Sequence, residues 1–156
     1  MEFRPADLAA MQEALALARQ SLLVNDPDVP VGALLLGPDG DTLATSANRR
    51  EVLSDPTAHA EVVVLREAAV ARGDWDLSGC TLVVTLEPCP MCAGAAHLSR
   101  VDRVVFGAWN EEYGAAGSAW DLLRDRRLAH RPEVTGGVLA DECSAVVREF
   151  FERLRG

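Results

Sequence analysis

Two short segments of the sequence carry residue types that could form a metal site with a proton carrier beside it. The first is His59-Ala60-Glu61, and the second is Pro88-Cys89-Pro90-Met91-Cys92. One imidazole and two thiolates give zinc three protein ligands, and a site with only three protein ligands keeps its fourth position open for water or substrate. The pattern therefore predicts one catalytic Zn²⁺ per chain, held by His59, Cys89 and Cys92.

Glu61 is the residue of this set that the metal does not need. Zinc lowers the pKa of a bound water to about 7, so hydroxide forms on the metal at neutral pH and can attack a ring carbon. A nearby carboxylate can take up the proton and pass it to a ring nitrogen and to departing ammonia. The order H-x-E followed by P-C-x-x-C is the signature of zinc deaminases, in which the glutamate is not a ligand. We therefore expect Glu61 to be the catalytic acid and base.

Two other kinds of site can use similar residues. A Cys-x-x-Cys pair can be a thiol–disulfide redox centre, and a structural zinc needs a fourth protein ligand. The candidates for that fourth ligand are Cys80, Cys143, His97 and His130, and none of them has a partner at the spacing of a zinc motif. We expect the two cysteines to be small buried residues and His97 to have a structural role.

Hydrophobic periodicity and turn residues predict the elements that must position these groups. Helices are predicted over residues 6–24, 57–71, 89–98 and 141–154. Strands are predicted over residues 31–36, 43–46, 81–86, 103–106 and 134–139, and the turn Gly37-Pro38-Asp39-Gly40 makes the first two a hairpin. The metal motifs thus fall at the starts of two helices, where free N–H groups favour thiolates. Alternating strands and helices predict a sheet covered on both faces.

Length and composition are those of one ordinary globular domain. The 156 residues are 49% hydrophobic and 25% charged, which predicts a single domain over residues 1–156. The apolar runs are too short to cross a membrane, and residues 1–5 lack the basic-then-apolar order of a signal peptide. Four cysteines, two of them in Cys-x-x-Cys, favour metal chemistry over a disulfide framework. We therefore expect a cytoplasmic protein.

The charge balance bears on whether nucleic acid is a partner. A net charge of −9 repels nucleic acid at long range, although a local cluster of arginines can override it. Such a phosphate-binding patch could contain Arg49, Arg50, Arg124, Arg126, Arg127 and Arg131. Alternatively, these side chains are solvated or pair with Asp121, Asp125 and Glu133.

Beyond the metal motif, the chain resembles the bacterial tRNA-specific adenosine deaminases, which belong to the cytidine deaminase superfamily. The matching segments span most of the chain in order: residues 29–33, 55–61, 85–89, 92–95, 103–108, 114–118, 130–131 and 137–143. The resemblance implies a three-layer α/β/α cytidine deaminase-like fold with a five-stranded mixed sheet. It also implies a homodimer that converts adenosine to inosine at the wobble position of the tRNA anticodon arm.

The resemblance further implies where the substrate binds. Asn48 is expected to contact the adenine ring, or else to be only a turn residue at the end of the second strand. The backbone around Ala60 and Leu86–Glu87 is expected to hold the base and the water on the metal. Val31 and Asn110 are expected to complete the substrate site.

One segment departs from the pattern of the family. Where the tRNA deaminases carry an acidic residue followed by a basic one, this chain has Trp109-Asn110-Glu111-Glu112-Tyr113. Fewer cations would weaken contact with phosphate, while Trp109 and Tyr113 could stack on a base or cover a small pocket. The alternative function is therefore deamination of free bases or nucleosides, such as guanine or cytosine, on the same scaffold. A catalytically silent subunit is a third hypothesis, which the presence of Glu61 disfavours.

Overall fold

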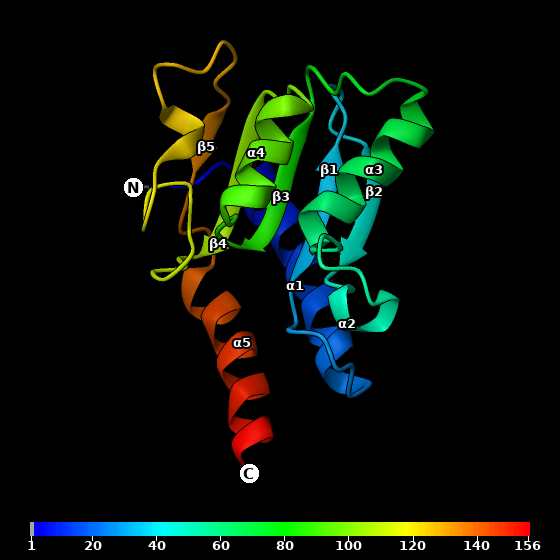
Figure 1. The fold of residues 1–156 in the computed structure, drawn as a ribbon, viewed down its shortest axis with the longest axis vertical. Coiled ribbons are helices and arrows are strands. Elements are labelled where there is room, and N and C mark those ends of the chain that lie inside the picture. Colours follow the sequence, from blue (N-terminus) through cyan, green and yellow to red (C-terminus); the bar gives the residue numbers. More distant parts are fainter. Residues whose placement is uncertain (1) are drawn as a thin grey trace.

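A five-stranded mixed sheet forms the centre of the protein (Figure 1). The structure is a computed structural model that describes residues 2–156. The strands lie in the order β2-β1-β3-β4-β5 and are β1 (Gly32–Leu36), β2 (Thr42–Ala47), β3 (Thr81–Leu86), β4 (Arg103–Ala108) and β5 (Glu133–Thr135). β1 pairs antiparallel with β2 and β3, whereas β3, β4 and β5 run parallel to one another. The predicted five-stranded mixed sheet and the predicted hairpin are confirmed.

Helices cover both faces of the sheet and give the fold three layers (Figure 1). They are α1 (Pro5–Leu23), α2 (Arg50–Leu53), α3 (Ala60–Arg72), α4 (Pro90–Leu98) and α5 (Ala140–Arg155). Leu34 and Val83 belong to the core under α1 and α5, and the alternate residues Leu35 and Leu82 belong to the core under α3 and α4. Because side chains alternate across a strand, apolar strands of this kind can be buried on both faces. In the part of the chain that the structure describes, no helix has both the length and the apolar character of a membrane span.

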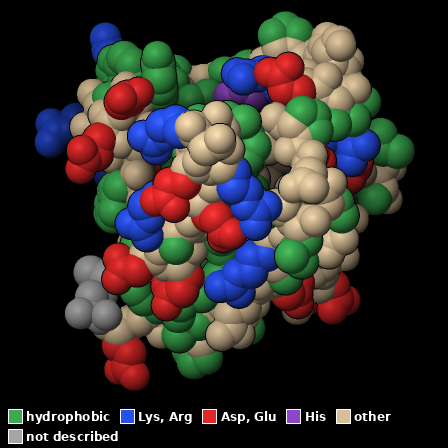
Figure 2. All heavy atoms as spheres, turned by 90° about the horizontal axis from the view of Figure 1, so that it is seen from below, with side chains coloured by type: hydrophobic (Ala, Val, Ile, Leu, Met, Phe, Trp, Pro, Cys, Tyr) green, Lys and Arg blue, Asp and Glu red, His purple; other side chains and the backbone are tan. Residues whose placement is uncertain are grey.

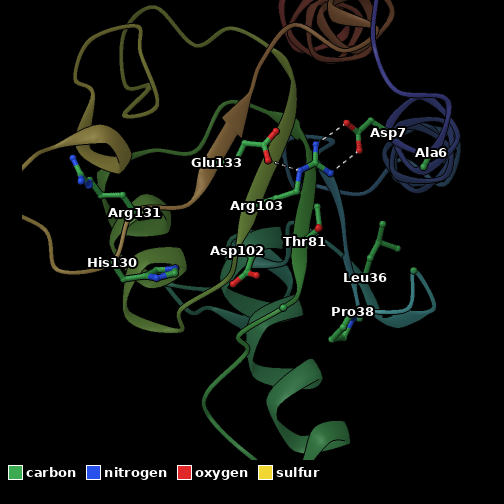
Figure 3. Close-up of a pocket in the computed structure, with 13 residues that line it drawn as sticks. Ala6, Asp7, Leu36, Pro38, Thr81, Asp102, Arg103, His130, Arg131 and Glu133 are labelled. Carbon is green, nitrogen blue, oxygen red and sulfur yellow. Dashed lines mark hydrogen bonds and ion pairs between the residues drawn. The ribbon is translucent and has the colours of Figure 1, made fainter.

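A cluster of charged side chains joins three elements at the end of the sheet opposite the metal motifs (Figure 3). Arg103, the first residue of β4, donates two hydrogen bonds of 3.0 and 2.8 Å to Asp7 of α1. Its Nε lies 3.4 Å from a carboxylate oxygen of Glu133 in β5. The Asp7 side chain is only 4% exposed, and the two-pronged geometry is the strong form of an arginine–carboxylate contact. This cluster holds α1 against the parallel half of the sheet.

The strand predicted over residues 134–139 is wrong in its extent, because β5 ends at Thr135. A Cβ on Gly136 would overlap the ring of Phe106, so the chain needs glycine where it leaves the sheet. Gly137 and Leu139 then take φ values of 87° and 53°, which no continuing strand allows. The chain therefore turns directly into α5.

The region before the first metal motif also differs from the prediction. The helix predicted from residue 57 begins at Ala60, and the short helix α2 was not predicted. The carboxylate of buried Asp28 accepts the backbone N–H groups of Glu51 and Val52, at 2.7 and 3.2 Å. Free N–H groups in the first turn of a helix need such acceptors. Because this acceptor lies far from α2 in the sequence, local pattern alone could not reveal the helix.

Candidate active site

The three predicted metal ligands come from the first turns of two neighbouring helices. His59 immediately precedes α3, and Cys89 immediately precedes α4, both with extended backbone. Pro90 occupies the first position of α4, where its fixed φ suits the helix and its missing N–H leaves no bond unmade. Cys92 follows in the first turn of α4 and is buried. α3 and α4 pack on the same face of the sheet, which brings their two starts together (Figure 1).

The donor atoms lie at the separations that one tetrahedral zinc requires. His59 Nδ1 is 3.7 Å from Cys89 Sγ and 3.5 Å from Cys92 Sγ, and all three donor atoms lie within 4.8 Å of one another. Tetrahedral angles with Zn–S of about 2.3 Å and Zn–N of about 2.0 Å separate nitrogen and sulfur by about 3.5 Å. These residues could therefore hold one metal ion where they stand, and among residues 2–156 they form the one group of three such ligands found.

Hydrogen bonds among the three ligands already favour a thiolate. Hydrogen bonds from Cys92 and from His59 lower the pKa of Cys89 to about 4, although burial opposes this change. The bond to Cys89 raises the pKa of His59, and the bond that Cys92 makes to Cys89 raises the pKa of Cys92. Without a metal, hydrogen bonds thus connect the same three side chains that a divalent cation would bind.

Glu61 lies beside these ligands in the first turn of α3 and is 5% exposed. Burial raises the pKa of its carboxyl group, which its own backbone N–H and the charge of His59 partly oppose. A raised pKa makes a carboxylate a stronger proton acceptor, as a general base requires. The structure therefore brings Glu61 and the three ligands together in an environment suited to acid–base chemistry.

A pocket of about 810 Å³ opens onto His59, Glu61 and Cys89, whereas Cys92 is fully buried behind its lining. Four of the five residues expected to contact substrate line it, namely Val31, Asn48, Leu86 and Asn110, whereas Ala60 is fully buried and is not part of the lining. The other lining residues are Val29, Arg50, Glu87, Pro90, Met91, Trp109, Glu111, Glu112, Tyr113, Val147 and Phe151. A volume of this size lies within the range of small-molecule sites.

The position of Asn48 fits both roles considered from the sequence, a turn residue and a substrate contact. Its Nδ2 donates to the carbonyl of Val29 at 3.2 Å, and its Oδ1 accepts the N–H of Arg50 at 3.2 Å. These bonds join the chain before β1 to the chain after β2, as expected of a turn residue. The same side chain lines the pocket, as expected of a substrate contact.

Three residues of the site were not found from the sequence. Val147 and Phe151 reach the pocket from α5, whose amphipathic pattern predicted a helix but not which of its residues would meet a distant site. The third is the side chain of Glu87, which is 1% exposed and accepts backbone N–H groups from the segment after β4. Only the backbone at this position was expected to matter, and no sequence signal marks the carboxylate.

The six arginines considered as a phosphate patch divide between the two edges of the sheet (Figure 1). Arg49 and Arg50 lie at the start of α2 beyond β2, and the other four lie in the connection that leads to β5. Arg124 pairs with Asp121 at 2.9 Å and Arg127 with Asp125 at 2.7 Å, as the paired alternative expected, whereas Glu133 pairs with other arginines. On the end of the molecule where α5 terminates, acidic side chains stand among the basic ones (Figure 2).

The two aromatic residues of the acidic segment have different surroundings. The Trp109 ring packs edge-on against Phe106, with centroids 4.9 Å apart, and lies over Gly136 and Gly137. It therefore joins its loop to the chain between β5 and α5. Tyr113 is 62% exposed at the rim of the pocket, so its ring is accessible to a ligand.

The other cysteines and His97 have structural surroundings, as predicted. Cys80 and Cys143 are buried, at 0% and 1% exposure. The Sγ of Cys80 accepts a hydrogen bond from Arg72 at 3.0 Å. His97 Nδ1 lies 2.8 Å from the carbonyl of His130, which links α4 to the segment before β5.

A three-layer α/β/α domain that brings one histidine, two cysteines and a buried glutamate to the start of two helices has the architecture of a zinc-dependent deaminase. Comparison with protein families agrees: the cytidine and deoxycytidylate deaminase zinc-binding region matches residues 5–108, which include all four of these groups. The chain belongs to this family.

Two relatives show how far the similarity extends. The chain is 46% identical to the tRNA-specific adenosine deaminase of Bacillus subtilis over 145 residues, which cover 93% of this chain and 88% of the relative. It is 50% identical over 154 residues to the tRNA(Ile)-lysidine synthase of Deinococcus deserti. That match covers 97% of this chain but 28% of the relative, so the chain spans little more than a quarter of that protein.

Solved structures support the same fold. A structure from a study of A-to-I editing by tRNA:A34 deaminases at the wobble position of transfer RNA matches with a TM-score of 0.82 and 38% identity, covering 88% of this chain and 98% of that one. The guanine deaminase of Nitrosomonas europaea matches with a TM-score of 0.76 and 29% identity, covering 96% and 86% of the two chains. The expected cytidine deaminase-like fold is thus confirmed.

Proposed function

We propose that this protein is a zinc-dependent hydrolase that deaminates adenosine to inosine at the wobble position of tRNA, and that residues 1–156 act as one deaminase domain. The observation that carries the proposal is the buried Glu61 carboxyl group, which lines one pocket together with His59 and Cys89, two members of the three-residue group that could hold a metal ion. The reaction breaks the bond between the ring carbon and its amino group. Water supplies the oxygen that replaces the amino group, and ammonia leaves.

Each residue of the metal site has a separate task in this proposal. His59, Cys89 and Cys92 would hold one Zn²⁺ per chain, as their mutual distances support. Bound zinc would supply the Lewis acidity that makes water nucleophilic at neutral pH. Glu61 accepts a proton from the attacking water and delivers protons to the ring nitrogen and the departing ammonia. Its burial and raised pKa support both halves of this role.

The base binds in the pocket between the metal ligands and α5. Apolar Val31 and Leu86 support its ring, and the amides of Asn48 and Asn110 supply polar contacts. The backbone at fully buried Ala60, between His59 and Glu61, is the further contact that we propose for the base. This division between apolar walls and a few polar groups is usual for small-molecule recognition.

RNA is the substrate that we favour. Both relatives compared above are named for tRNA, and one of them matches over nearly its whole length. At the rim of the pocket, Tyr113 and Phe151 are 62% and 42% exposed. Aromatic side chains of this kind can stack on the bases of single-stranded RNA loops. Arg50, also in the lining and half exposed, is a candidate phosphate contact.

Deamination of a free base or nucleoside, such as guanine or cytosine, is the second candidate. The acidic pair Glu111 and Glu112 lines the pocket, where it would repel the phosphates of an RNA. The similarity to the guanine deaminase fold favours a purine among the free bases. This candidate keeps the same metal ligands and the same role for Glu61.

We further propose a cytoplasmic homodimer. On the α3 and α4 layer, the apolar side chains of Val70, Trp75 and Leu98 are 83%, 61% and 70% exposed, and a second subunit would cover such a surface. The free cysteines, and a tRNA substrate, suit a reducing compartment.

The decisive experiment offers both substrate classes to the same protein. An anticodon stem-loop with a wobble adenosine, and separately a panel of free purines and pyrimidines, are incubated with wild type and with Glu61→Gln. We expect inosine in the RNA, at a rate that falls steeply with salt because phosphate contacts release counterions. Glu61→Gln should keep its zinc and lose about 10²- to 10⁴-fold in kcat, the usual contribution of a general acid and base.

The other outcomes separate the alternatives. Ammonia from a free base together with untouched RNA would support the second candidate and refute the first. A wild-type protein as inert as Glu61→Gln on every substrate would refute both.

A further inference from the structure

We propose that Glu87 is a positioning residue: its buried carboxylate holds the substrate-facing loop, residues 109–118, at a fixed place relative to the metal ligands. The proposal deepens the proposed function, on which its kinetic part rests. Glu87 lies between the last residue of β3 and Pro88-Cys89, so its backbone belongs to the segment that carries a metal ligand. Its side chain, in contrast, forms hydrogen bonds only with residues of the loop.

The carboxylate has four donors, all from the loop. Oε1 accepts the N–H of Asn110 at 3.0 Å and the hydroxyl of Ser118. Oε2 accepts the N–H groups of Ala116 and Ser118, both at 3.0 Å. The side chain is 1% exposed, and within residues 2–156 no arginine pairs with it. A charge buried in this way depends on hydrogen bonds from the loop for its stabilisation.

The loop is shaped around the carboxylate. A Cβ on Gly114 would overlap the Glu87 carboxyl group and the carbonyl of Asn110, so only glycine lets the chain pass this close. Backbone bonds extend the contact on both sides, from Glu87 N–H to the carbonyl of Ala108 at 2.8 Å and from Ala115 N–H to the carbonyl of Pro88 at 2.7 Å. Residues 87 and 88, which precede the expected metal ligand Cys89, are thus both hydrogen-bonded to the loop or to the strand end before it.

The consequence concerns the geometry of the pocket. The loop contributes Asn110 and Tyr113 to the lining of the pocket, and Leu86 and the expected metal ligand Cys89, on either side of Glu87, line the same pocket. Because Oε1 and Oε2 each accept two donors, the carboxylate fixes both ends of the loop, at residue 110 and at residues 116–118. Together with the two backbone bonds, this side chain therefore sets the distance between a substrate held by the loop and the metal ligands.

The first test is amide hydrogen exchange in Glu87→Gln. Glutamine keeps the shape of the side chain but turns one acceptor oxygen into a donor NH₂, which then faces two N–H or O–H donors. We expect exchange across residues 109–118 to become about tenfold faster or more, while exchange in α3 and α4 and the zinc content stay at wild-type values. This measurement needs no substrate, so it is independent of the proposed function.

Asp28→Asn is the matched control. Asp28 is 2% exposed and likewise accepts backbone N–H groups, but from Glu51 and Val52 of α2, the helix that carries Arg50 to the pocket. It should speed exchange at residues 50–53 and leave residues 109–118 unchanged. Ser118→Ala removes only the hydroxyl donor and should loosen the loop less than Glu87→Gln does.

The second test is kinetic and uses the wobble-adenosine RNA. We expect Glu87→Gln to lower kcat/KM by about tenfold to a hundredfold, mainly through KM, because the wall moves while the metal ligands and Glu61 stay in place. If wild type does not act on RNA, the proposed function fails, and hydrogen exchange still decides the role of Glu87. Unchanged exchange at residues 109–118 would overturn the proposal. So would faster exchange throughout the chain with loss of zinc, since Glu87 would then support only the fold.

Discussion

The Cys89 thiol shows how neighbouring groups set the chemistry of a single residue. Its pKa falls to about 4 because Cys92 and His59 donate hydrogen bonds to its sulfur, and it lies where free N–H groups begin a helix. Cys143 is buried more deeply, at 1% exposure, and receives no hydrogen bond from a ligand set, so burial raises its pKa to about 11. The same residue type is therefore suited to bind a metal at one position and to fill the core at the other.

This contrast predicts the result of metal analysis on two matched variants. Wild type is expected to carry about one zinc per chain, the stoichiometry of a single three-ligand site. Cys89→Ala should lose the metal, whereas Cys143→Ala should keep it and lose only packing. Elemental analysis after dialysis against a weak chelator measures both. Full retention of zinc in Cys89→Ala would refute the ligand set.

At the scale of elements, the short helix α2 depends on a contact outside itself. Its four residues are too few to be a stable helix alone, and its first-turn N–H groups bond to the buried carboxylate of Asp28. α2 carries Arg50 to the pocket and adjoins Asn48. One wall of the site is thus fixed by a cap that comes from the chain before β1.

We therefore expect Asp28→Asn to destabilise the protein by about 1–3 kcal/mol, the cost of leaving buried donors without their charged acceptor. Asp74→Asn is the matched control, because exposed Asp74 also accepts one backbone N–H, from Asp76. That change should stay within about 0.5 kcal/mol of wild type. Urea unfolding gives both values, and equal effects of the two substitutions would contradict the capping role.

The position at which β5 ends also depends on contacts with other parts of the fold. Residues 134–139 have the apolar composition of a strand, yet the chain must pass close to the Phe106 and Trp109 rings, where Gly136 allows the approach. Gly136 and Gly137 disfavour a strand, but they do not give the position at which it ends. Only the packing of those rings defines the point at which β5 stops.

At the scale of the whole molecule, the Asp7 and Arg103 pair connects helix and sheet across 96 residues of sequence. Both side chains are largely buried, at 4% and 17% exposure, whereas the neighbouring Glu133 is 51% exposed. Hydrogen bonding to Asp7 raises the pKa of Arg103. Burial makes this pair costly to break, because removal of one partner leaves the other charge without compensation.

The expected result is a large difference between two charge-neutralising substitutions. Asp7→Asn should lower the free energy of unfolding by about 3–5 kcal/mol, as breaking a buried pair does. Glu133→Gln, which neutralises the exposed partner of the same arginine, should cost about 1 kcal/mol or less. The double change Asp7→Leu with Arg103→Met should recover part of the loss. Chemical denaturation measures the series, and similar costs for Asp7→Asn and Glu133→Gln would contradict a buried, stabilising pair.

The sequence by itself determined the fold class and most element boundaries, and it predicted His59, Cys89 and Cys92 as metal ligands and Glu61 as the acid and base. These features follow from residue types at short fixed spacings and from periodicity, which depend on neighbours along the chain. The tertiary structure alone decided that Phe151 reaches the pocket, that the arginines divide between two sheet edges, and that Glu87 and Asp28 hold the two walls. The physical reason is that a buried carboxylate is defined by the donors that surround it, and here every donor comes from a distant segment that only the folded chain brings within hydrogen-bonding distance.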